Sequence, residues 1–146
     1  MRNLPRSAGH SVLSLTAEYA LRAVLALARA DGRGLKATEI ADATGTSRNY
    51  MSKTLNVLAK EGIVRSRRGP TGEFVLGRPA KEISVAQIAR PFREERAPAR
   101  CLLADRACSP AAPCAVHHRW TAVTAATQAS LDVTVSELLE EDRTAE

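Results

Sequence analysis

Apolar residues recur every three or four positions in the first part of the chain, which is typical of helices with one buried face. Between residues 15 and 29 the apolar positions that share one helix face are Ala20, Val24, Leu27 and Ala28. Further on, Thr46-Ser47 supplies an N-cap and Gly62 a left-handed C-cap for another helix. The pattern predicts three helices in succession, over residues 15–29, 37–43 and 48–60.

After Gly62 the pattern changes to short extended segments. Residues 63–68 and 73–76 read as two strands, and the Gly-Pro-Thr-Gly turn between them predicts a hairpin. Three further helices are expected: a short one over 85–89, a long one from near Pro113 to about Ser130, and a last one, capped by Thr134, that ends at Glu140. The fold class that follows is mainly α with a small β-hairpin wing.

The third predicted helix has two contrasting faces. Its apolar face consists of Met51, Leu55, Leu58 and Ala59. Its opposite face carries the donors and acceptors Arg48, Asn49, Ser52, Lys53 and Asn56, which suit base edges and phosphates. The hairpin adds Arg67 and Arg68 at its tip. Helix, short helix, turn, helix and basic hairpin is the order of a winged helix-turn-helix, so we expect these seven polar residues to contact double-stranded DNA.

Charge supports a polyanionic partner. The chain of 146 residues has a formal net charge of +5. Residues 48–78 alone hold seven Lys and Arg against two Glu, so this segment's net charge equals that of the whole chain. A solvated helix face beside a basic turn is the simpler explanation, but the order of the elements favours DNA binding.

All three cysteines of the chain fall within fourteen residues, at Cys101, Cys108 and Cys114, and His117 follows. Thiolates and an imidazole can hold zinc or an iron–sulfur cluster. Zinc sites usually show two tightly spaced pairs, so the wider spacing here favours an iron–sulfur cluster. Three incidental thiols, or a regulator that uses zinc or thiol oxidation, are the alternatives.

Other classes of protein find little support. No run approaches the ~18 apolar residues of a membrane span, and an odd cysteine count without an export signal favours a cytoplasmic protein. The chain has three histidines and no Ser/His/Asp set or phosphate loop, so we expect no enzyme; an iron–sulfur electron carrier is the rival from another class. Trp120 is expected in the core or in a dimer seam, on one face with Val116 and Val123.

Residues 14–141 resemble the IscR/NsrR family of winged-helix iron–sulfur regulators. The resemblance is carried by four segments: Leu15–Ala23, Asn49-Tyr50-Met51, the wing Arg68–Leu76, and Cys114-x-x-His117-x-x-Trp120. Two departures stand out. Glu73 occupies a wing position where the family usually has Gly, and the loop is one residue longer between Cys101 and Cys108 than the commonest pattern.

The resemblance implies a homodimer whose long C-terminal helix crosses between protomers, with a cluster held by the three cysteines. The fourth ligand differs within the family. His117 matches the histidine that completes a two-iron two-sulfur cluster, and Glu18 matches the first-helix carboxylate that completes a four-iron four-sulfur cluster from the other subunit. Both are present, so the sequence leaves the cluster type open.

The sequence thus predicts a dimeric repressor that binds a palindromic operator and senses nitric oxide, redox state or iron–sulfur supply through its cluster. Its expected parts are a flexible arm (1–13), a winged helix-turn-helix domain (14–80), a connector (81–100), a cysteine loop (101–118), a dimerisation helix with a terminal helix (113–141) and a tail (142–146).

Overall fold

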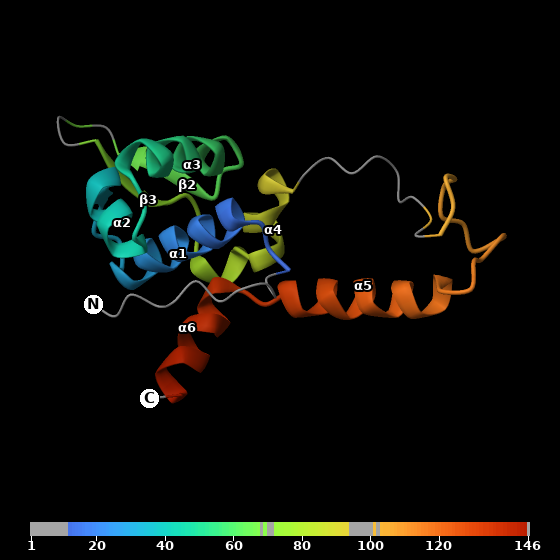
Figure 1. The fold of residues 1–146 in the computed structure, drawn as a ribbon. Coiled ribbons are helices and arrows are strands. Elements are labelled where there is room, and N and C mark those ends of the chain that lie inside the picture. Colours follow the sequence, from blue (N-terminus) through green and yellow to red (C-terminus); the bar gives the residue numbers. More distant parts are fainter. Residues whose placement is uncertain (1–11, 68, 70–71, 94–100, 102, 146) are drawn as a thin grey trace.

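The computed structural model describes residues 12–67, 69, 72–93, 101 and 103–145. Most of the predicted arm, Arg68 at the wing tip and the end of the predicted connector lie outside these residues. Figure 1 shows a head built from the N-terminal helices and the wing, and a long helix, α5, that extends beyond it. The predicted class, mainly α with a small β wing, is confirmed.

Local sequence accounts for the three helices of the head, which are α1 (Leu15–Arg29), α2 (Ala37–Thr44) and α3 (Arg48–Lys60). The Ser14 hydroxyl accepts a hydrogen bond from the Ala17 N–H, and the Ser47 hydroxyl accepts one from the Tyr50 N–H, so both longer helices have a side-chain N-cap. Gly45 ends α2 with φ 71°, a conformation that glycine adopts without strain. The predicted bounds of α1 and α3 are confirmed, and α2 extends one residue further.

The wing is part of a three-stranded antiparallel sheet in the order β1-β3-β2. The hairpin strands are β2 (Val64–Arg67) and β3 (Glu73–Leu76), which pair Val64 with Leu76 and Arg67 with Glu73. A third strand, β1 (Leu35–Lys36), pairs with the start of β3 and was not predicted. A strand of two residues is too short to show the alternation of apolar and polar side chains that marks a strand in the sequence. Only its pairing with β3, almost 40 positions later, identifies β1 as a strand.

One apolar core joins these elements. Its fully buried large side chains come from the three head helices, the wing strands and two later segments: Val24, Ile40, Met51, Leu55, Leu58, Ile63, Val64, Ile83, Ile88 and Val135. Ile88 lies on the short helix α4 (Val85–Ala89), whose predicted bounds are confirmed, between the 3-10 turns η1 (Ala80–Glu82) and η2 (Arg90–Phe92).

The last helix, α6 (Val135–Thr144), is tied to the head and runs four residues past its predicted end. The Val85 N–H donates to the Val133 carbonyl at 3.0 Å, and the Val135 N–H donates to the Ile83 carbonyl at 2.8 Å. Thr134 caps the helix as predicted, with its hydroxyl accepting from the Glu137 N–H. These contacts place both ends of the connection between α5 and α6 against the head.

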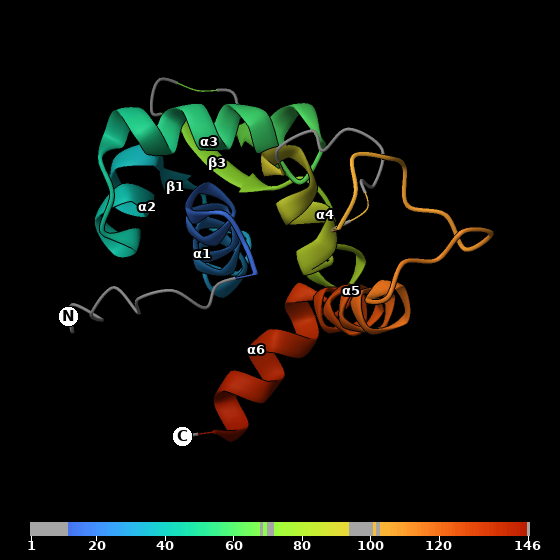
Figure 2. The same ribbon diagram turned by 45° about the vertical axis from the view of Figure 1, so that its right-hand side comes forward.

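The long helix α5 (His117–Leu131) begins four residues later than Pro113, where it was expected. The His117 N–H donates to the Cys114 carbonyl and closes a turn before the helix, and Val116 has φ −105° and ψ 1°, outside helical geometry. Figure 1 shows α5 extending away from the head, Figure 2 views it nearly along its axis, and among its residues only His117 and Leu131 at the two ends are buried. Trp120 is 44% exposed, so its expected place in the core is wrong for the single chain. None of the described helices combines the length and apolar character needed to cross a membrane.

Candidate DNA interface and cysteine site

The two predicted faces of α3 are confirmed. Met51, Leu55 and Leu58 are fully buried. On the other side Arg48, Asn49, Lys53 and Asn56 are exposed and Ser52 is half-buried. The five polar residues lie within the first nine of the thirteen positions of the helix, toward the N-terminal end that a recognition helix presents to the major groove. Guanidinium, amide, hydroxyl and ammonium groups there can bind base edges and phosphates.

Tyr50 holds the start of α3 against α1. Its hydroxyl lies 2.5 Å from the Thr16 hydroxyl, and its ring meets the Tyr19 ring edge-on with centroids 5.7 Å apart. The backbone carbonyl of Tyr50 accepts a hydrogen bond from the Thr54 hydroxyl. The packing of α3 against α1 is therefore set by these polar and aromatic contacts as well as by the core. The sequence signalled Tyr50 only as part of a family motif.

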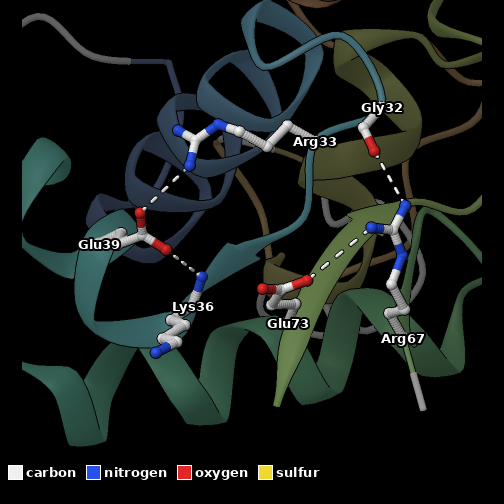
Figure 3. A network of polar contacts seen from close by, with 6 residues as sticks. All are labelled: Gly32, Arg33, Lys36, Glu39, Arg67 and Glu73. Atoms are coloured by element: carbon white, nitrogen blue, oxygen red, sulfur yellow. Dashed lines mark hydrogen bonds and ion pairs between the residues drawn. The ribbon is translucent and has the colours of Figure 1, made fainter. Parts of the chain in front are cut away.

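The wing arginines lie in different surroundings. The Arg67 guanidinium donates to the Gly32 carbonyl at 2.9 Å and lies 3.8 Å from the Glu73 carboxylate (Figure 3). Arg68 lies outside the described residues. Arg65, two positions before Arg67 on β2, is exposed and was not singled out from the sequence. Its alternation with Arg67 is the signal that could have identified it, because side chains two apart on a strand share a face.

The cysteine loop precedes α5, and its three thiols and His117 fall into two pairs, Cys101 with Cys114 and Cys108 with His117. Cys101 is buried, with 8% of its surface exposed. A hydrogen bond from the Leu103 backbone N–H, with a second from the Cys114 thiol, holds the pKa of the Cys101 thiol below its ordinary value. The sulfur of Cys108 lies 3.2 Å from Nδ1 of His117. Both pairs combine groups that ligate soft metals, and the hydrogen bonds to Cys101 favour the thiolate form that ligation needs.

The structure does not bring all four donors to one point. Within the described part of the chain, no three His, Cys, Asp or Glu side chains stand close enough together to hold a metal ion. A helix from Pro113, as expected from the sequence, would put Cys114 and His117 on one turn, but Cys114 precedes the helix, and His117 is paired with Cys108 instead. The donor set matches an iron–sulfur cluster in chemistry, and ligation would require the two pairs to converge.

Glu18 lies apart from the cysteines of its own chain. It is on α1 inside the head, 3.9 Å from Arg22, with a quarter of its side chain exposed. Figure 1 shows the cysteine loop at the opposite end of α5 from the head. Glu18 could therefore reach a cluster only from a second subunit, as the resemblance implies.

Comparison with known proteins gives a consistent family. A family model described as Rrf2, iron-dependent transcriptional regulator, matches residues 13–141. An HTH-type transcriptional regulator of Aquifex aeolicus is 36% identical over 111 residues, which are 75% of this chain and 77% of that protein. T. potens IscR is similar in structure with a TM-score of 0.74 and 27% identity, over 94% of this chain and 92% of IscR. The oxidised form of Staphylococcus aureus CymR has a TM-score of 0.69 and 27% identity, over 88% of this chain and 95% of CymR.

Proposed function

Because the chain belongs to the Rrf2 family of transcriptional regulators, we propose that it is a homodimeric repressor whose affinity for a palindromic operator is set by an iron–sulfur cluster. Membership in a family of regulators also confirms that it is not an enzyme. The observation that carries the cluster proposal is the gathering of every cysteine of the chain with His117 in one loop at the start of α5.

DNA recognition is assigned to the exposed face of α3 with the wing beside it. Arg48, Asn49, Ser52, Lys53 and Asn56 read the major groove, and Arg68 reaches phosphates or the minor groove. A two-fold dimer matches a palindrome whose half-sites are about one helical turn apart. Binding should weaken steeply with salt, since each neutralised phosphate releases counterions.

The dimer is assigned to α5. A helix of fifteen residues with burial only at its ends is not stabilised by packing within its own chain. Trp120 and Val123 are 44% and 56% exposed and lie three positions apart, on one face. A second copy of α5 would cover them, which agrees with the dimer seam expected for Trp120.

Cluster control follows from the position of the loop. Cys101, Cys108 and Cys114 would supply three thiolates, with His117 of the same chain or Glu18 of the partner as the fourth ligand. When bound, the cluster supplies a group that nitric oxide, oxidants or iron limitation can alter. Its loss would reorder the loop before α5 and shift the two heads, and a coupling of ~1–3 kcal/mol would change DNA affinity ~5–150-fold.

The test is a visible spectrum of anaerobically purified protein with iron and sulfide analysis. About two irons per protomer, lost in His117→Ala but kept in Glu18→Gln, would support the two-iron site. About four, lost in Glu18→Gln but kept in His117→Ala, would support the four-iron site. Protein without iron and sulfide, after reconstitution as well as before, would contradict the cluster and leave the DNA interface intact.

A regulator that uses zinc or thiol oxidation remains the second candidate. Two observations favour it: the pairing of Cys101 with Cys114, and the similarity to CymR, which has been solved in an oxidised form. Zinc protein would be colourless with one zinc per site. A thiol regulator would hold no metal, and oxidation would lower its free thiol content and change its DNA affinity.

A further inference from the structure

We propose that Arg67 and Glu73 form a clasp that fixes the wing to the turn between α1 and β1, so that Arg67 is a positioning residue for DNA binding and makes no phosphate contact. The sequence had placed Arg67 among the direct DNA contacts and had marked Glu73 as a departure from the family's usual glycine. This inference rests on the DNA interface proposed above.

The clasp joins three segments of the chain. Arg67 and Glu73 are register partners at the outer end of the β2–β3 ladder, with a guanidinium nitrogen 3.8 Å from the carboxylate. The other terminal nitrogen of Arg67 donates to the Gly32 carbonyl at 2.9 Å. Figure 3 shows the guanidinium between these two acceptors, facing the turn. Both of its terminal nitrogens are engaged within the protein, which leaves Arg67 poorly placed to form a two-pronged contact with a phosphate.

Gly34 shows that room has been made for the Glu73 side chain. A Cβ atom at Gly34 would lie 2.5 Å from the Glu73 carboxylate oxygen Oε2 and 2.9 Å from its Cβ. The glycines with positive φ among the described residues are Gly32, Gly45, Gly62, Gly69 and Gly72, so the backbone conformation at Gly34 does not itself require glycine. The Glu73 side chain, including its Cβ, supplies the reason for a glycine there.

Neighbouring contacts hold the turn that receives the clasp. Arg33 lies 3.4 Å from the Glu39 carboxylate, which also accepts a hydrogen bond from the Lys36 N–H at 2.7 Å (Figure 3). Lys36 is in turn the register partner of Glu73. The turn, β1 and the first turn of α2 therefore form one polar unit, and the clasp attaches the root of the wing to it.

The electrostatic role of Glu73 follows from this arrangement. An unpaired carboxylate beside the wing would repel DNA phosphates, whereas a carboxylate paired with Arg67 is neutralised and keeps the wing in place. The two roles predict opposite effects on DNA affinity when the Glu73 carboxylate is removed. If Glu73 only repels DNA, removing it strengthens binding, and if it belongs to the clasp, removing it weakens binding.

The test compares Arg67→Ala, Glu73→Ala and the double variant on a duplex enriched from a random-sequence library by the wild-type protein. Both single variants should weaken binding by roughly three- to tenfold. The double variant should bind no more weakly than the single variant with the lower affinity, because the effects of two residues in one contact are not additive. The salt dependence of Arg67→Ala should match the wild type. Tighter binding by Glu73→Ala, with a salt slope reduced by about one in Arg67→Ala, would overturn the clasp.

Hydrogen exchange tests the clasp without DNA. Amides of residues 32–34 and 73–76 should exchange faster in Arg67→Ala and Glu73→Ala, and should be unchanged in Lys81→Ala, which removes an exposed positive charge on η1, outside the turn and the wing. Gly34→Ala should also speed exchange, because the new Cβ atom collides with the Glu73 side chain. Adding Glu73→Gly to Gly34→Ala should remove that collision. Unchanged exchange in all variants would overturn the inference. If the wild type enriches no duplex, the DNA interface fails, while exchange still decides whether the clasp exists.

Discussion

Basic residues in this protein differ in whether another group of the protein already pairs with them. Lys53 stands exposed on the outer face of α3, with no salt bridge to any described residue, whereas Arg67 is held by Glu73 and Gly32. An exposed basic side chain that forms no ion pair within the protein can form one with a DNA phosphate. Basic side chains that are already paired contribute through the position of the backbone that carries them.

Replacing Lys53 with alanine should therefore weaken operator binding about tenfold, equivalent to about 1.4 kcal/mol. The salt slope should also fall by about one, because one phosphate contact is lost. Fluorescence anisotropy at several salt concentrations measures both quantities. Lys81→Ala is the matched control, since Lys81 is also exposed but lies on η1, outside α3. Equal affinities for the Lys53 variant and wild type would contradict this docking of α3.

At the scale of the element, two helix starts depend on glutamates. Glu39 accepts the Lys36 N–H at the start of α2, and this hydrogen bond is the main reason that its pKa lies below the ordinary value of 4.5. Glu137 accepts the Thr134 N–H and hydroxyl at the start of α6, which lowers its pKa in the same way. Both carboxylates bind their partners better when ionised, so both stabilise the folded state only when charged.

These caps predict a loss of stability in acid. A group whose pKa is lower when folded stabilises the protein fully above its unfolded pKa, here near 4.5, and loses this effect as the pH falls through the folded pKa. Thermal unfolding followed by circular dichroism should show a midpoint that falls below about pH 4.5. Glu39→Gln and Glu137→Gln should reduce this fall, whereas Glu82→Gln should not. Identical pH profiles for the cap variants and wild type would contradict the assignment.

At the scale of the whole molecule, the head is complete within one chain and α5 is not. The head has a continuous core that includes Val135 from α6, whereas α5 buries only its two ends. The cysteine loop stands at the far end of α5 from the head (Figure 1). Through the described elements, a change in the loop can reach the head along α5, and a partner subunit would offer a further route, which is why a dimer is central to the proposed control.

The dimer assignment predicts that Val123→Glu converts the protein to monomers, weakening association at least tenfold by burying a charge in an apolar seam. Analytical ultracentrifugation over a range of concentrations measures this. Ala125→Glu is the control, because Ala125 is also exposed but lies two positions on, toward the opposite side of α5. Circular dichroism should show both variants folded, as neither position contributes to the head core. Equal self-association of the two variants would contradict a seam through Val123.

The sequence by itself determined the helices of the head, because caps and a period of 3.6 are local signals: α1, α3 and α4 begin and end where the pattern predicted. The family resemblance likewise pointed to the correct regulator class. Only the tertiary structure decided which groups meet. Arg67 finds Gly32 across 35 positions, β1 exists because β3 pairs with it, and His117 contacts Cys108, with α5 beginning only at His117. Such partners depend on register and on the path of loops, which no local spacing along the chain encodes.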